Sequence, residues 1–124
     1  MDHTEARLLE LATWGAALHP AGIPSAVVDR AKLIIPDLIG CNLAGGLDDG
    51  MAQFARALGR RPGLATLVGT SVRADPAAAA LFNGSATVAL ELDETNRFAK
   101  GHPGAHVWPA VLAVSYTHLR AHET

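Results

Sequence analysis

Titratable side chains gather in one stretch of this chain, residues 91–109, which reads ELDETNRFAKGHPGAHVWP. The stretch combines three carboxylates, two cations and two imidazoles: Glu91, Asp93, Glu94, Arg97, Lys100, His102 and His106. A carboxylate close to His102 would orient its imidazole for acid–base chemistry. Pro103 predicts a helix start, and the free N–H groups of a helix N-terminus attract anions. The stretch therefore suits abstraction of a proton next to a substrate carboxylate.

Other interpretations of the same stretch remain open. A metal site would take its ligands from four side chains: Glu91, Asp93, His102 and His106. Pro103 and Gly104 argue against one helix through both histidines, which that site would need. A phosphate-binding loop is disfavoured because no glycine-rich phosphate motif is present. On residue types alone, the leading alternative is a solvated surface whose carboxylates cap helices and pair with the two cations.

The composition is that of a small globular domain or of part of a larger one. Of the 124 residues, 49% are hydrophobic and 18% charged, and the net charge of −2 offers nothing to nucleic acid or to an anionic membrane. The single cysteine, Cys41, lies in an apolar run, which predicts a core residue in a reducing compartment. No stretch matches a signal peptide or a membrane span, so we expect a soluble, cytoplasmic protein.

Apolar residues recur at helical spacing through most of the chain. We predict helices over residues 4–18, 25–43, 49–58 and 76–90, and a further helix from residue 103 onward. Pro36 should kink the second helix or split it in two. Residues 64–68, LATLV, are the one expected strand. The predicted fold is therefore all-α, a multi-helix bundle-like domain with at most one short β segment.

The last eleven residues, VSYTHLRAHET, depart abruptly from the aliphatic helix before them. They resemble the translation of a transposon-based sequencing adapter, a segment found at the ends of reading frames from unassembled environmental DNA. We therefore divide the chain into a partial helical domain, residues 1–113, and a non-native tail, residues 114–124. His118, His122 and Glu123 are left out of the functional argument for this reason.

Three motifs carry a resemblance to a known family. The second predicted helix contains Asp-Leu-Ile-Gly at residues 37–40, and Val-Gly-Thr at residues 68–70 precedes AAALFNGSA at residues 78–86. The polar stretch contains ELDET at residues 91–95, followed by HPGAHVWPA at residues 102–110. Together they resemble the N-terminal helical domain of the 2-methylcitrate dehydratase family (MmgE/PrpD). The similarity runs along nearly all of residues 4–113.

The resemblance implies an enzyme, without metal or other cofactor, that acts on small di- or tricarboxylates. It would remove a proton alpha to a carboxylate, with loss of water or carbon dioxide or with epimerisation. The implied catalytic residues are His102, Asp93 and Glu91. The implied substrate-binding residues are Thr95, Arg97 and Lys100.

Two departures from the family pattern concern this site. Glu91 stands where an aspartate is usual, and the interval from Thr95 to His102 is one residue longer. The family also draws lysines and a lid domain from downstream sequence and forms homodimers, so we expect this chain to be inactive by itself. The alternative is a self-contained helical binding or scaffold module whose polar stretch is only a surface.

Overall fold

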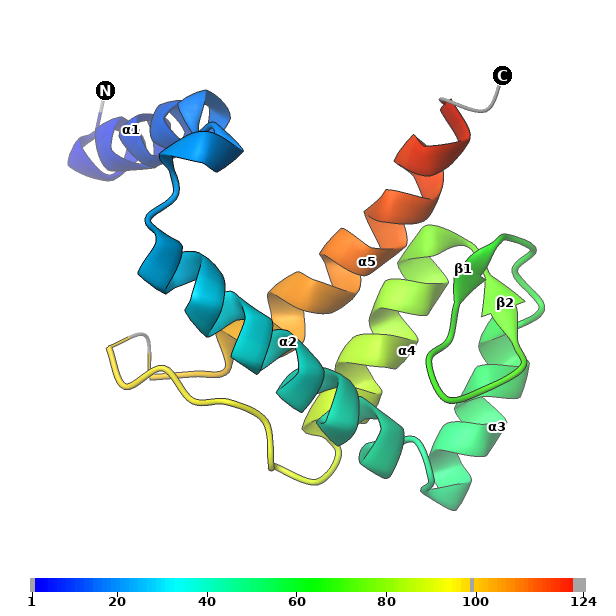
Figure 1. Ribbon diagram of the computed structural model, residues 1–124. Helices are drawn as coiled ribbons and strands as arrows, with labels where there is room; N and C mark the ends of the chain where they lie inside the picture. The colour runs from blue at the N-terminus through cyan, green and yellow to red at the C-terminus, as the bar shows by residue number, and fades with distance from the viewer. Residues whose placement is uncertain (1, 99, 122–124) are drawn as a thin grey trace. The chain divides into compact units, whose positions relative to one another are not determined.

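The computed structural model describes residues 2–98 and 100–121, with side chains as far as Tyr116 (Figure 1). Within these residues the chain forms five α-helices, one short 3-10 helix and one two-stranded antiparallel sheet, which confirms the predicted helical fold. It divides into two compact parts, residues 1–32 and 33–124, and each is described by itself. No helix in the described part of the chain is long and apolar enough to cross a membrane.

The first part holds α1 (His3–Ala17), the 3-10 helix η1 (Pro20–Gly22) and the start of α2 (Ser25–Gly45). The Asp2 N–H donates to the Glu5 carboxylate at 3.1 Å, as in one half of a capping box. α1 ends before His19-Pro20, as predicted, because the residue before a proline is pushed out of the α region. None of the residues of α1 is buried.

Pro36 lies inside α2, which runs on as one helix and is not split in two. The second half of α2 turns Leu38, Cys41 and Asn42 into the protein. Cys41 is buried as predicted, and this burial raises the pKa of its thiol, with the charges of Asp37 and Asp93 adding to the effect. Such a thiol is a core residue and not a nucleophile.

α3 (Asp49–Leu58) begins at the predicted cap, where the Asp48 carboxylate accepts the Gly50 N–H at 2.8 Å. The expected strand is present as β1 (Ala65–Thr66), but it pairs with β2 (Arg73–Ala74), which the sequence pattern did not predict. Ala65 lies opposite Ala74, and Thr66 lies opposite Arg73. In the connection, Gly69 has a φ of +81°, a left-handed conformation that glycine adopts without steric cost.

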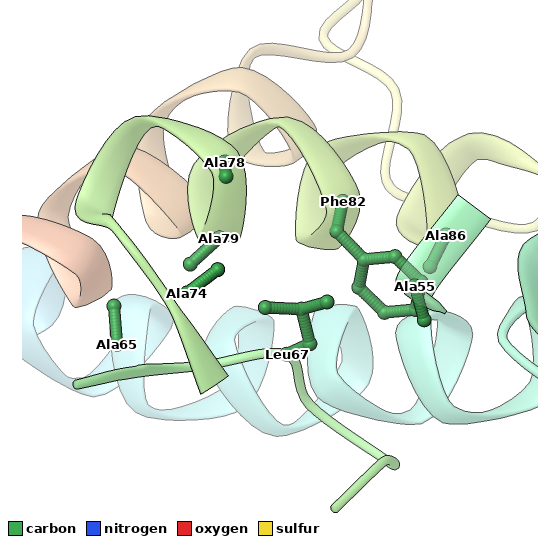
Figure 2. Close-up of a cluster of buried hydrophobic side chains, with 8 residues drawn as sticks. All are labelled: Ala55, Ala65, Leu67, Ala74, Ala78, Ala79, Phe82 and Ala86. Carbon is green, nitrogen blue, oxygen red and sulfur yellow. The ribbon is translucent and has the colours of Figure 1, made fainter. Parts of the chain in front are cut away.

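α4 (Pro76–Val88) and α5 (Pro103–Ala121) lie side by side and form the main helix pair of the second part (Figure 1). Phe82 of α4 is fully buried, and its ring centroid lies 6.2 Å from that of Phe54 in α3. Figure 2 shows the buried cluster to which Phe82 belongs, where α3, α4 and the sheet region meet. Most of its members are alanines: Ala55, Ala65, Leu67, Ala74, Ala78, Ala79, Phe82 and Ala86. Alanines at these contacts let the elements approach closely.

α5 continues through Pro109 and into residues 114–121. Tyr116 packs against the buried cluster, and its hydroxyl donates to Thr66 Oγ1 at 2.8 Å. The adapter origin of residues 114–124 stays a prediction. The side chains of His118, His122 and Glu123 lie outside the described residues.

A buried amide ties the helices to the sheet. The Asn83 side chain accepts the Val68 N–H at 2.9 Å and donates to the Thr66 carbonyl at 3.0 Å. Its own backbone carbonyl accepts from Asn42 Nδ2 at 2.8 Å and from Thr87 Oγ1 at 2.7 Å. Asn83 therefore joins α2, α4 and the sheet at one fully enclosed point.

Asp75 caps α4 and makes the stability of the fold depend on pH. Its carboxylate accepts the N–H groups of Ala77 and Ala78 and forms an ion pair with Arg61. The Ala78 hydrogen bond, assisted by Arg61, holds the pKa of Asp75 below its ordinary value despite some desolvation. A lowered folded-state pKa contributes stability above the unfolded-state value, about 3.9, and this contribution is lost as pH falls through the folded value.

We therefore compare wild type with Asp75→Asn, which keeps a capping oxygen but loses the charge. The melting temperature of the wild type should exceed that of the variant by a constant margin from pH 7 to about pH 5. The margin should shrink below about pH 4, where the carboxyl takes up its proton. Thermal melts followed by circular dichroism would measure it, and a margin unchanged at pH 3 would contradict the ionic role.

Candidate functional site

The polar stretch is a loop that leaves the end of α4 and returns at the start of α5. The Asn96 N–H donates to the Gly101 carbonyl at 2.9 Å and closes the outer part of the loop. Phe98, within that part, is 92% exposed. Glu91 and Lys100 have φ values of 54° and 50°, a left-handed conformation that costs side chains other than glycine about 1 kcal/mol or more. The loop therefore holds two strained residues, both in the predicted site.

Asp93 and His102 form the centre of the site. The Asp93 side chain is 1% exposed, and its Oδ2 lies 3.2 Å from Nδ1 of His102, whose side chain is 35% exposed. The same Nδ1 lies 2.9 Å from the Glu94 carbonyl oxygen. A carbonyl oxygen only accepts hydrogen bonds, so the neutral ring carries its proton on Nδ1. Nε2 is then left with a lone pair and is free to take a proton from a substrate.

Asp93 has few partners besides His102. Among the described residues its buried Oδ2 has no hydrogen-bond partner, although it lies within ion-pair distance of the ring. A buried carboxylate beside an imidazole offers a counter-charge to the imidazolium that forms when Nε2 is protonated. Of the two carboxylates expected near His102, Asp93 is the one that lies beside its ring. The acid–base role of this pair stays a prediction.

Glu94 occupies the place that we expected a substrate anion to take. The first turn of α5 was predicted to offer its free N–H groups to a bound carboxylate, but Glu94 Oε1 accepts the Gly104 N–H at 2.5 Å. A carboxylate is favoured at a helix N-terminus by the helix dipole. The protein's own side chain therefore takes up the Gly104 N–H of this anion site, and binding of a substrate carboxylate there stays a prediction.

The other four predicted site residues are exposed: Glu91, Thr95, Arg97 and Lys100. Within the described residues, no hydrogen bond or ion pair joins them to Asp93 or His102. Glu91 and Asp93, two residues apart, would project to one side only from an extended backbone. The left-handed backbone at Glu91 breaks that alternation, and one carboxylate is exposed while the other is buried.

A hollow of about 440 Å³ lies elsewhere in the second part of the chain. It is lined by small and aliphatic residues without acid–base groups: Gly40, Leu43, Ala44, Gly46, Leu47 and Gly69. The residues that line this hollow cannot transfer a proton. We therefore place the candidate site at His102 and not at the hollow. His106, a ligand in the metal interpretation, is exposed on α5, and the described residues hold no cluster of three metal-ligating side chains.

Comparison with known proteins decides the family. A family model described as the MmgE/PrpD N-terminal domain matches residues 9–122. The chain belongs to the MmgE/PrpD family. A cis-aconitate decarboxylase-like protein (oryM) of Aspergillus oryzae is 34% identical over 115 residues, which are 91% of this chain. A cis-aconitate decarboxylase of Aspergillus terreus is 33% identical over 108 residues, which are 86% of this chain. No solved structure matches it.

This MmgE/PrpD chain spans 24% and 22% of the lengths of those two relatives. The chain therefore corresponds to a small share of each relative. The family resemblance drawn from residues 91–110 is confirmed, because the matched range includes all of them.

Two substitutions at Glu91 can separate the energetic cost of its left-handed backbone from a role of its carboxylate in the chemistry. Glycine adopts a positive φ without steric cost, whereas alanine does not. Glu91→Gly should therefore be more stable than Glu91→Ala by about 1 kcal/mol, as measured by urea unfolding. Both variants lose the carboxylate, so equal losses of activity in the full-length protein would assign Glu91 to the chemistry. Equal stability of the two variants would contradict the strain.

Proposed function

We propose that this MmgE/PrpD chain is the N-terminal part of a lyase or isomerase that acts on small di- or tricarboxylates without a cofactor. The reaction begins with removal of a proton from the carbon next to a substrate carboxylate. The observation that carries the proposal is the arrangement of His102, whose Nδ1 is held by the Glu94 carbonyl beside buried Asp93. That arrangement leaves Nε2 as a base at the surface of the protein.

In this mechanism His102 Nε2 takes the proton and the ring becomes an imidazolium beside the Asp93 carboxylate. In dehydration, the imidazolium then returns the proton to the departing hydroxyl, which leaves as water. In epimerisation, a proton returns to the same carbon from the other face. Decarboxylation omits the first proton removal. The carbon–carbon bond breaks to release carbon dioxide, its electron pair stays on the substrate, and His102, protonated at Nε2, donates the one proton that the substrate takes up.

The exposed residues of the loop are proposed as the substrate side of the site. Arg97 and Lys100 supply positive charge, and Thr95 a hydroxyl, within a few residues of His102 in the sequence. They would bind substrate carboxylates once the rest of the protein encloses the loop. The names of the two relatives support cis-aconitate, a tricarboxylate, as the first substrate to test. Assembly of the full-length protein as a homodimer stays a prediction.

The test is proton exchange catalysed by the full-length protein that contains this chain. Incubation with cis-aconitate and a panel of citrate-like acids in D₂O should place deuterium on the carbon alpha to a carboxylate, seen by ¹H NMR. A chelator should leave the rate unchanged, and the 124-residue chain alone should show no turnover. A folded full-length protein that exchanges or converts none of these acids would refute the proposal and favour a non-catalytic helical module.

A further inference from the structure

We propose that Glu94 is a positioning residue that fixes the tautomer and orientation of His102. This inference rests on the proposed function, in which the lone pair on His102 Nε2 takes the substrate proton. It concerns a side chain that lies outside the set predicted from the sequence. It also explains why the loop bends back onto the start of α5.

Glu94 forms one hydrogen bond to the His102 ring and another to the backbone just after His102. Its backbone carbonyl accepts from Nδ1 of the ring at 2.9 Å. Its carboxylate accepts the N–H of Gly104, two residues beyond His102 in the first turn of α5. Since both bonds come from one residue, the carboxylate bond to the helix also sets where the Glu94 carbonyl points. A shift of the side chain would move the acceptor that keeps the proton on Nδ1.

Gly104 shows how closely the Glu94 side chain is held. A Cβ atom at position 104 would lie 2.6 Å from Glu94 Oε1 and 2.7 Å from Cδ1 of Leu38, a residue that is 1% exposed. Both distances are too short for real contacts, so a side chain larger than hydrogen would displace the carboxylate or the leucine. The α helix itself accepts alanine readily. The need for glycine at position 104 therefore comes from Glu94 and Leu38.

A simpler role for Glu94 would be that of a helix cap. A cap stabilises the start of α5 through the same Gly104 bond but has no reason to select a histidine tautomer. The two roles predict different behaviour of the His102 ring. A positioning residue keeps the proton on Nδ1, whereas a cap does not select a tautomer. The test must therefore observe the nitrogens of His102 as well as the stability of the fold.

Four variants separate these roles. Glu94→Ala removes the carboxylate, and Glu94→Gln keeps an oxygen acceptor without the charge. Gly104→Ala leaves Glu94 in the sequence but places a methyl group 2.6 Å from the present position of its carboxylate oxygen, which disturbs the bond to the helix. Gly40→Ala is the matched control, because it adds the same methyl group to a helical glycine with open space around it.

The readout is ¹⁵N NMR of histidine-labelled protein at a pH where the ring is neutral, with the His102 signals assigned by their loss in His102→Gln. We expect wild type, Glu94→Gln and Gly40→Ala to keep the proton on Nδ1. Glu94→Ala and Gly104→Ala should show a mixture of both tautomers. In the full-length protein their kcat should fall on the order of 100-fold with little change in KM, as for a misplaced catalytic group.

Two results would overturn the proposal. One is a wild-type tautomer in Glu94→Ala with only a lower melting temperature, which would make Glu94 a cap and nothing more. The other is a large loss of kcat with the tautomer unchanged, which would give Glu94 a direct role. Failure of the proposed function is seen separately, because His102→Ala would then retain activity while the tautomer result still decides whether Glu94 orients the ring.

Discussion

Replacing His102 with alanine in the full-length protein should lower kcat by about 10²- to 10⁴-fold, the range typical of losing a general acid–base group. The ring is 35% exposed, and its loss leaves no large cavity, so the protein should still fold. Steady-state turnover of the best acid found in the exchange assay measures the effect. Circular dichroism checks the fold.

His106→Ala is the matched control for this experiment. His106 lies four residues further on and is exposed on α5, whereas Asp93 pairs with His102. Its replacement should leave kcat within about two-fold of wild type, because a surface substitution away from the reacting atoms changes little. Near-wild-type activity in His102→Ala, or an equal loss in His106→Ala, would remove His102 from the mechanism.

The largest effect on stability is expected from Asn83→Ala. This side chain is 1% exposed and satisfies both the Val68 N–H and the Thr66 carbonyl. Alanine would leave both groups buried without partners, at about 1–3 kcal/mol each. The free energy of unfolding should therefore fall by about 2–5 kcal/mol, measured by urea denaturation of the 124-residue chain.

Leu81→Ala controls for the change to alanine in α4. Leu81 lies two residues earlier in the same helix and is 55% exposed. Its replacement should change the free energy of unfolding by less than about 1 kcal/mol. A loss in Asn83→Ala no greater than that in Leu81→Ala would mean that the sheet relaxes to satisfy its own polar groups.

The helices could be predicted because their signals are local. Asp75-Pro76 and Asp48 mark helix starts through caps that need only a few neighbouring residues, and both starts are confirmed. β2 was missed because a two-residue strand has no periodicity, and its pairing is set by contact with β1 and the helices. Of the two effects expected of Pro36, a kink or a split, the split does not occur, since tertiary packing overrides a local breaker.

The site was predictable in part. The motif indicated a carboxylate near His102 but left open whether it was Glu91 or Asp93, and in the structure Asp93 lies beside the ring. Glu94 was missed because it was read as one more charge in a polar run. The available signal was the helix start at Pro103, since the N–H of Gly104 needs an acceptor. The positive φ of Glu91 could not be predicted, because it depends on how the loop folds back from α4.

The contact of Gly45 with α4 connects the C-terminal end of α2 with the surroundings of His102. A Cβ at Gly45 would lie only 2.1 Å from the Ala86 carbonyl oxygen, so α2 and α4 touch backbone to backbone there. Leu38, which abuts the Gly104 position, sits about 10 Å back along the same rigid helix. A residue larger than glycine at position 45 would push α2 away from α4 and would move Leu38 away from Gly104. The surroundings of the histidine therefore depend on a buried residue at the opposite end of this part of α2.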